Sequence, residues 1–163
     1  MKGKRKKSLP YIKFTEDEDD PYRQNFDDGS YCTECGIVYI NKNWKLDASD
    51  EFKKNKIICP ACRKIKDRYY GGLLELSGKY LKEHKEEILN IVNNEEKRQR
   101  SKNALHRIAK IENISDDKIL IYTTDNRLAY RIGKVVYSAC KGNFTIKWAD
   151  GEHFVRVYWS RDE

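Results

Sequence analysis

Two short stretches carry the most informative pattern of the sequence: Tyr31-Cys-Thr-Glu-Cys-Gly-Ile-Val-Tyr-Ile40 and Ile57-Ile-Cys-Pro-Ala-Cys-Arg-Lys-Ile-Lys66. The first contains the pair Cys32 and Cys35, and the second contains the pair Cys59 and Cys62. A Cys-x-x-Cys loop directs two sulfur atoms toward one point, and two such loops complete a tetrahedron of thiolates around a metal ion. The spacing predicts one structural zinc ion with no open coordination position.

The paired cysteines have two other interpretations. Two disulfides are disfavoured because we expect a cytosolic protein, in which thiols stay reduced. A rubredoxin-like iron site remains open, since tetrahedral sulfur suits iron as well as zinc. The lysine-rich surroundings and the long remainder of the chain fit an electron carrier poorly. The fifth cysteine, Cys140, stands alone, and we expect it to be a small core residue.

The residues around the cysteine pairs predict a small metal-stapled module over residues 31–78. Gly36 fits a tight knuckle, residues 37–40 and the segment near Trp44 suggest a hairpin, and residues 63–70 suggest a short helix. This order favours a treble-clef-like arrangement over a plain zinc ribbon. Charged residues make up 36% of the 163 residues and the mean hydropathy is −0.89. A domain with so little core material often needs a metal.

The segment before this module is distinguished by its blocks of charge, and the segment after it by the helical spacing of its apolar residues. Residues 1–13 carry six positive charges and residues 14–30 carry seven acidic groups, so we expect residues 1–30 to be a disordered tail. The other interpretation is a solubilising tail that folds back on its own acidic stretch. Residues 79–103 predict one connecting helix, with an apolar stripe that ends at Val92. Its polar end is either solvated or rests on something outside the protein.

Residues 104–163 predict a small β-β-α-β-β unit. Residues 107–114 and 119–122 read as strands, and Thr123, Thr124 and Asp125 are capping residue types before a helical stripe. The expected stripe consists of Leu128, Ile132, Val135, Val136 and Ala139, and Gly142 ends the helix. Residues 144–148 and 153–159 alternate like strands around the turn signal Asp150-Gly151. The chain as a whole is therefore expected to be an α+β protein.

Charge and the missing motifs restrict the function. The net charge of +7 and the pI of about 9.1 favour an anionic partner, with nucleic acid ahead of membrane. The sequence has no run of about 18 apolar residues and no signal-peptide pattern, so we expect a cytoplasmic protein. It contains no nucleophile elbow, phosphate-binding glycine loop or carboxylate pair. We therefore expect a binding protein that is not an enzyme and has no small-molecule substrate.

Basic and aromatic side chains are interleaved, as in RNA-binding surfaces. The candidates in and after the metal-stapled module are Lys42, Trp44, Lys45, Arg63, Lys64, Lys66, Arg68 and Tyr69. The candidates in the predicted helices are Arg98, Arg100, Arg127, Arg131 and Lys134. The other interpretation is a solvated lysine-rich surface, with the aromatic residues filling the small core and the helix charges facing water. The three histidines have no partner at ligand spacing.

Several segments together resemble a known family. They are Cys59-Pro-Ala-Cys-Arg-Lys-Ile-Lys-Asp-Arg, Gly72-Leu-Leu-Glu-Leu-Ser-Gly, Thr123-Thr-Asp-Asn-Arg-Leu-Ala-Tyr-Arg-Ile-Gly and Val155-Arg-Val-Tyr-Trp. Residues 30–161 thereby resemble short bacterial zinc proteins related to the N-terminal part of the archaeal and eukaryotic nuclear export adaptor of the large ribosomal subunit. The resemblance implies docking on that subunit, with the zinc knuckles against ribosomal RNA. The positions of this chain to which the resemblance assigns the family's functional residues are the four cysteines and Thr123, Thr124, Asp125 and Arg131.

This chain departs from the adaptor pattern in three ways. The adaptor has more cysteine pairs and continues into further domains, and Asn126-Arg127 stands where its relatives tend to have Ile-His. A shared binding surface therefore implies a role in subunit maturation or in holding idle ribosomes inactive, and export is not implied. The rival functions are a zinc-dependent protein-interaction module and a DNA-binding regulator. No helix-turn-helix pattern supports the latter.

Overall fold

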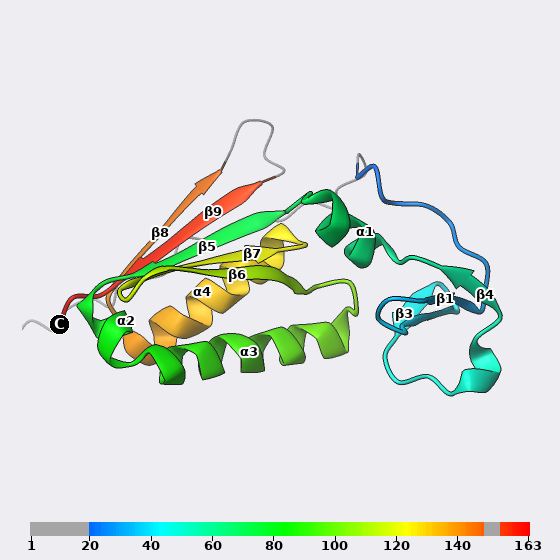
Figure 1. The fold of residues 1–163 in the computed structure, drawn as a ribbon, viewed down its shortest axis with the longest axis horizontal. Coiled ribbons are helices and arrows are strands. Elements are labelled where there is room, and N and C mark those ends of the chain that lie inside the picture. Colours follow the sequence, from blue (N-terminus) through cyan, green and yellow to red (C-terminus); the bar gives the residue numbers. More distant parts are fainter. Residues whose placement is uncertain (1–19, 149–153) are drawn as a thin grey trace, which may run out of the picture.

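The computed structural model describes residues 20–148 and 154–163, and it shows an α+β protein with two sheets in these ranges. Figure 1 shows an elongated molecule in which a small module lies beside a larger helix-covered sheet. We call residues 20–70 the cysteine module, and residues 71–148 and 154–163 the sheet domain. The expected α+β class is confirmed. Positions 149–153, which include the predicted turn at Asp150-Gly151, lie outside the described residues.

The cysteine module is a four-stranded sheet followed by a short helix. Its elements are β1 (Ser30–Cys32), β2 (Val38–Ile40), β3 (Asn43–Lys45), the 3-10 helix η1 (Asp50–Phe52), β4 (Asn55–Ile57) and α1 (Pro60–Asp67). The strand order is β3-β2-β1-β4. β2 and β3 form the expected antiparallel hairpin, and β1 pairs with β4 in parallel. The predicted order of a hairpin and then a short helix is present, but the helix begins at Pro60, inside the second cysteine pair, and ends at Asp67, whereas residues 63–70 were expected.

The segment before β1 belongs to this module. Residues 1–19 of the expected tail lie outside the described residues, but Asp20 and Tyr22 contact α1, and Phe26 packs against Tyr39 and Trp44 of the hairpin. The Tyr22 hydroxyl donates to an Asp67 carboxylate oxygen at 2.7 Å, and Lys64 pairs with Asp20 at 2.6 Å. Tyr22 is 9% exposed. Residues 20–30 are therefore grouped here with the cysteine module, because aromatic and ionic contacts join them to α1 and to the β2–β3 hairpin.

The sheet domain, in its described residues, contains five strands and three helices. They are β5 (Gly72–Ser77), α2 (Lys79–Glu83), α3 (Lys85–Lys102), β6 (Ile108–Ser115), β7 (Lys118–Thr123), α4 (Asn126–Cys140), β8 (Asn143–Trp148) and β9 (Val155–Ser160). The strand order is β6-β7-β5-β9-β8. β6, β7, α4, β8 and β9 form the expected β-β-α-β-β sequence of elements.

β5 corrects the expected boundary at residue 78. It is the middle strand of the larger sheet, antiparallel to β7 and parallel to β9, so it belongs to the sheet domain. Gly72 allows α4 to approach β5 closely, since an added Cβ atom would lie 2.6 Å from the Ala129 Cβ atom. Any larger residue at this position would push α4 away from the sheet.

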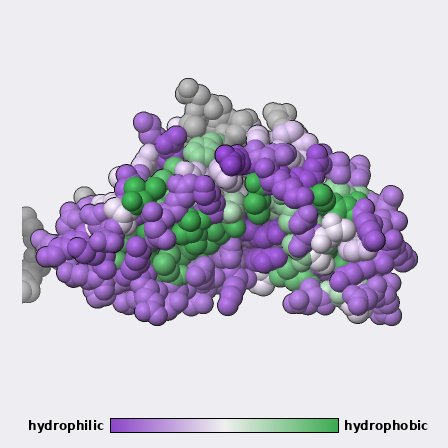
Figure 2. Space-filling model, viewed as in Figure 1, coloured by the Kyte–Doolittle hydropathy of each residue, from purple (hydrophilic) through white to green (hydrophobic). Residues whose placement is uncertain are grey.

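The core lies between the sheet and the two longer helices. α4 packs on β5, β7, β8 and β9, and α3 packs on α4. Leu128, Ile132 and Val136 are fully buried as expected, but Ala139 is exposed and Val135 half-buried. The buried stripe of α4 instead includes Ala129, Gly133 and Cys140. Cys140 is therefore a small core residue, as expected. Figure 2 shows hydrophilic residues over most of the visible surface. Among the described residues, no helix is long and apolar enough to cross a membrane.

The predicted connecting helix differs from expectation at two places. It is two helices, because the backbone breaks at His84 between α2 and α3. Its polar end packs within the protein: Glu95 and Gln99 are 6% and 4% exposed, and the Gln99 amide donates to Glu95 at 2.7 Å. The Glu96 carboxylate also accepts the backbone N–H of Ile108. Polar side chains can therefore form a buried helix face when they satisfy one another.

Candidate metal centre and adjoining basic groove

The first cysteine pair is held by a knuckle that follows β1. The backbone N–H of Cys32 donates to the carbonyl of Ile37 at 2.9 Å, and that of Gly36 donates to the carbonyl of Cys32 at 2.8 Å. Gly36 has a φ of 84°, a left-handed conformation that a residue without a Cβ atom adopts easily. The chain therefore reverses between Cys32 and Ile37 and brings both sulfurs to one side.

The second pair begins α1. Cys59 is the N-cap residue, and Pro60 takes the first helical position, where no backbone donor is needed. The backbone N–H of Cys62 donates to Cys59 Sγ at 3.4 Å, and the backbone N–H of Cys59 donates to Cys32 Sγ at 3.3 Å. Backbone donors and the positive end of the helix dipole stabilise negative charge on these sulfurs.

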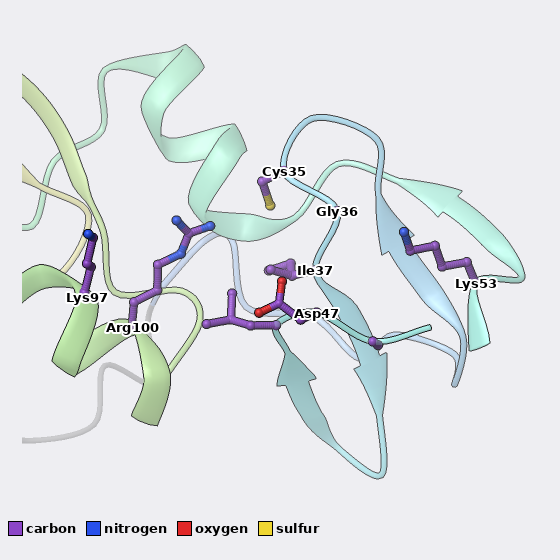
Figure 3. Close-up of a pocket in the computed structure, with 9 residues that line it drawn as sticks. Cys35, Gly36, Ile37, Asp47, Lys53, Lys97 and Arg100 are labelled. Carbon is purple, nitrogen blue, oxygen red and sulfur yellow. The ribbon is translucent and has the colours of Figure 1, made fainter. Parts of the chain in front are cut away.

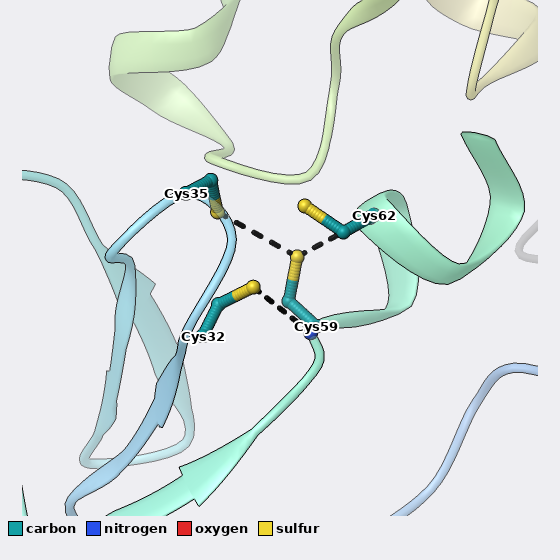
Figure 4. A group of neighbouring side chains, drawn as sticks. All are labelled: Cys32, Cys35, Cys59 and Cys62. Carbon is teal, nitrogen blue, oxygen red and sulfur yellow. Dashed lines mark hydrogen bonds between the residues drawn. The ribbon is translucent and has the colours of Figure 1, made fainter. Parts of the chain in front are cut away.

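The four sulfurs gather at one point (Figure 4). All four Sγ atoms of Cys32, Cys35, Cys59 and Cys62 lie within 4.8 Å of one another, and those of Cys35 and Cys59 are 3.8 Å apart. Metal–sulfur bonds of about 2.3 Å in a tetrahedron imply sulfur–sulfur distances of about 3.8 Å. The four cysteines could therefore hold one metal ion. Three of them are at most 8% exposed, as is typical of a structural site.

The cysteines differ in their affinity for protons. A hydrogen bond from Cys59 lowers the pKa of Cys35 to about 4. The same hydrogen bond, together with burial, raises the pKa of Cys59 far above its usual range. Burial also raises the pKa of Cys62. Because thiolates are the metal ligands, ligation by Cys59 and Cys62 would release protons.

Arg107 is a partner of the cluster that sequence reasoning missed. Its Nη2 atom lies 3.0 Å from Cys59 Sγ and 3.4 Å from Cys62 Sγ, and the residue is only 7% exposed. Its backbone N–H donates to the hydroxyl of Thr124 at 3.0 Å. Four thiolates and a divalent ion leave a net charge of about −2, which a buried guanidinium partly offsets. No local pattern identifies Arg107, since it is 45 residues from Cys62.

A basic groove lies between the cysteine module and the end of α3. It consists of two adjoining cavities of about 610 and 780 Å³, which share Leu46, Asp47 and Arg100. Figure 3 shows Arg100 and Lys97 on the α3 side, across from Cys35 and Asp47. Among the described residues, the cations that line the groove are Lys42, Lys45, Lys53, Lys97, Arg100 and Lys102, and the only lining acid is Asp47. Trp44 also lines the groove, beside Lys45.

The charges of the groove are poorly neutralised. Lys53 pairs with Asp50 at 3.0 Å. In the part of the chain that the structure describes, no carboxylate forms an ion pair with the other five cations, Lys42, Lys45, Lys97, Arg100 and Lys102. The buried Nε atom of Arg100 also has no hydrogen-bond partner among the described residues. Of the predicted RNA-binding residues, the structure therefore brings Lys42, Trp44, Lys45 and Arg100 together, although Arg100 is far from the others in the sequence.

The candidates around α1 are occupied by contacts within the protein. Lys64 pairs with Asp20, Lys66 pairs with Glu34 at 2.8 Å, and Arg63 lies over the ring of Tyr22 at 5.3 Å. Tyr69 packs against the Tyr22 ring at 5.2 Å. Arg68 ends α1 and is exposed. These residues do not line the basic groove, and the charges of Lys64 and Lys66 are balanced inside the cysteine module.

The remaining candidates are dispersed. Thr123 and Thr124 are 0% and 3% exposed, and their hydroxyls donate to backbone carbonyls of Asp125 and Leu105 at 2.7 Å. Their burial does not fit the expected contact with RNA. Arg131 and Lys134 are exposed on α4, where Arg127 is half-buried. Arg98 is exposed, lies 3.8 Å from Glu95 and does not line the groove.

Comparisons with known proteins add no assignment. No protein-family model matches the chain. No curated protein and no solved structure matches it either. The features of the chain that bear on function are therefore the cysteine cluster and the charge and shape of the surface around it.

Proposed function

We propose that this is a zinc-stabilised RNA-binding protein whose basic groove holds a stretch of sugar–phosphate backbone. The observation that carries the proposal is the composition of the groove: among the described residues, six cationic side chains line it with a single acid. Phosphates supply most of the affinity in protein–nucleic acid complexes, and lysine and arginine neutralise them. The protein acts in this proposal by binding, without catalysis.

Arg100 supports an anionic occupant. Its Nε atom is buried without a partner in the described part of the chain, and the residue lines both cavities of the groove. Among the described residues Arg100 forms no ion pair, so its guanidinium leaves positive charge beside the groove, and arginine–phosphate contacts are strong. Trp44 is half-buried and packs against Phe26 and Tyr39, and the accessible part of its ring lines the groove beside Lys45.

The metal contributes by holding one wall of the groove. Cys35, Gly36 and Ile37 of the first knuckle line it, so the position of this wall depends on the cluster. A closed set of four thiolates is typical of structural zinc, which would supply folding free energy. The family resemblance extends the proposal to ribosomal RNA of the large subunit, in a role in subunit maturation or in holding idle ribosomes inactive.

Charge reversal in the groove tests this proposal. The variant Lys45→Glu with Lys102→Glu changes two exposed groove residues. Lys79→Glu with Lys82→Glu is the matched control, because both residues are exposed on α2 at the far end of the sheet domain. We expect the groove variant to lose at least about tenfold in affinity for large-subunit RNA, measured by fluorescence anisotropy, and the control to lose much less. Equal losses in the two variants would contradict the groove assignment.

A further inference from the structure

One face of the larger sheet carries no helix in the described part of the chain. Along β5, β7 and β9, side chains that face α4, such as Leu74, Ile121 and Val157, alternate with residues on the opposite face. On that opposite face Leu73 is itself 9% exposed, and its neighbours on β7 and β9 are more accessible. Figure 1 shows α3 and α4 on the same side of the sheet. The strand register aligns five residues in one row across the opposite face: Lys110, Tyr122, Leu73, Arg156 and Lys147. We call these five residues the cross-sheet row.

The cross-sheet row presents an aromatic surface at β7. The ring of Tyr122 lies 4.8 Å from the ring of Tyr70, with an angle of 38° between the two planes. Tyr70 precedes β5, so the tyrosine pair is at the end of the sheet that adjoins the cysteine module. Both tyrosines are half-buried and keep part of their surface accessible. Such rings can stack on unpaired bases.

The row also concentrates positive charge. Lys147 and Arg156 are exposed and lie directly opposite each other on β8 and β9, an arrangement in which like charges repel. No carboxylate among the described residues forms an ion pair with either of them. At the other end of the row, hydrogen bonding and ion pairing with Glu112 raise the pKa of Lys110, while the nearby charge of Arg68 lowers it. A bound phosphate would relieve the repulsion between Lys147 and Arg156.

We propose that the cross-sheet row binds single-stranded RNA, with a base stacked on the Tyr122–Tyr70 pair and phosphates on Arg156 and Lys147. Three strand spacings of about 4.8 Å separate β7 from β8, roughly 14 Å in all. Open sheets of this kind can stack about two or three bases. The inference rests on the proposed RNA-binding function and adds a second contact, specific for unpaired nucleotides, to the basic groove.

The neighbouring row limits the site. It contains Glu112, Leu120, Glu75, Tyr158 and Thr145, so acidic groups border the cross-sheet row on the side away from the cysteine module. Glu112 pairs with Lys110 and Glu75 pairs with Lys118 at 2.8 Å, and the neighbouring row itself contains no cation that would bind phosphate. This favours an RNA path from the cross-sheet row toward the cysteine module. Linked contacts of this kind strengthen each other, because binding at one site raises the local concentration at the other.

The test uses the full chain and a uridine 12-mer that carries one 2-aminopurine, whose fluorescence falls when the base stacks on a ring. The wild-type protein should quench the fluorescence of the probe, and Tyr122→Phe, which keeps the aromatic ring, should do the same. Tyr122→Leu should quench the fluorescence less, and its affinity for the 12-mer should fall by a factor of about five or more. Lys147→Glu with Arg156→Glu should also weaken binding. Melting temperature and metal content should stay unchanged in each variant.

The outcomes separate this inference from the proposed function. In one outcome, the groove variant Lys45→Glu with Lys102→Glu binds RNA weakly, but both variants of the cross-sheet row bind it like wild type. These two variants are the single substitution Tyr122→Leu and the double substitution Lys147→Glu with Arg156→Glu. The cross-sheet row is then not an RNA site. This pattern would overturn the inference alone and favour a protein partner for the face. If wild type binds neither the 12-mer nor large-subunit RNA, the proposed function fails together with the inference.

Discussion

Arg107 Nη2 lies 3.0 Å from Cys59 Sγ, and this contact joins the two parts of the molecule. Cys59 caps α1 of the cysteine module, whereas Arg107 precedes β6 of the sheet domain and is held there by Thr124. The cation therefore reaches the cluster from a different domain. The occupancy of the cluster and the position of the cysteine module beside α3 should then depend on each other.

Replacing Arg107 by methionine should weaken metal binding. The substitution keeps much of the side-chain volume but removes the charge and both sulfur contacts, and loss of such an outer partner typically costs about 10- to 100-fold in metal affinity. Competition with a chromogenic chelator measures the change. Lys110→Met is the control, because Lys110 is an exposed cation of the same domain that pairs with Glu112. An Arg107→Met protein with wild-type metal affinity would show that the contact is incidental.

Cys59→Ser should release the metal and unfold the cysteine module while the sheet domain stays folded. A bound metal would supply folding free energy to the small module, whereas the larger core of residues such as Leu74, Ile121 and Val157 does not include the cluster. Hydrogen exchange should rise over residues 20–70 and remain slow in β5, β7 and β9. Cys140→Ala is the control, and it should retain one metal ion per chain. A Cys59→Ser protein that keeps a tightly bound ion and slow exchange would refute the ligand assignment.

The colour of the purified protein distinguishes the two metals that the ligands permit. Tetrahedral sulfur suits both zinc and iron, but zinc is colourless. We expect an aerobically purified protein to contain about one zinc ion per chain by elemental analysis and to show no visible absorption band. A visible thiolate-to-iron band with matching iron content would make the site an iron centre.

Gln99→Leu should destabilise the protein, because it leaves the buried carboxylate of Glu95 without the amide that lies 2.7 Å away. Removing one partner of a buried hydrogen bond costs about 1–3 kcal/mol. Urea denaturation measures the change in the free energy of unfolding. Asn94→Leu places the same side chain at an exposed position of α3 and should change stability by less than about 0.5 kcal/mol. Equal effects would mean that the polar end of α3 is not packed internally.

The sequence predicts features that depend on local spacing. The ligands, the Gly36 knuckle, the β2–β3 hairpin and the presence of a short helix after it all follow from short motifs. The structure places the four cysteines together, although α1 begins three residues earlier than expected. The buried stripe of α4 was largely predictable from its period, although Cys140 replaces Ala139 in it. Such elements are specified by nearest neighbours along the chain, so one sequence is enough to find them.

Features that depend on distant partners were not predictable. β5 is the middle strand of the sheet, but its partners β7 and β9 lie far along the chain, so its pairing is not a local property of the sequence. Arg107 and the buried pair of Glu95 and Gln99 look like surface residues until their partners are known. The basic groove likewise joins Lys45 and Arg100, which only the tertiary structure brings together.

Sucrose-gradient sedimentation of cell lysate, followed by blotting for the protein, tests the central claim most directly. At low salt the wild-type protein should sediment with large ribosomal subunits and should move to the top of the gradient as salt rises from about 50 to 200 mM, because phosphate contacts weaken over this range. Lys45→Glu with Lys102→Glu should stay at the top, and Lys79→Glu with Lys82→Glu should sediment like wild type. Wild-type protein that remains at the top at low salt, or a groove variant that still sediments with the subunit, would contradict the account.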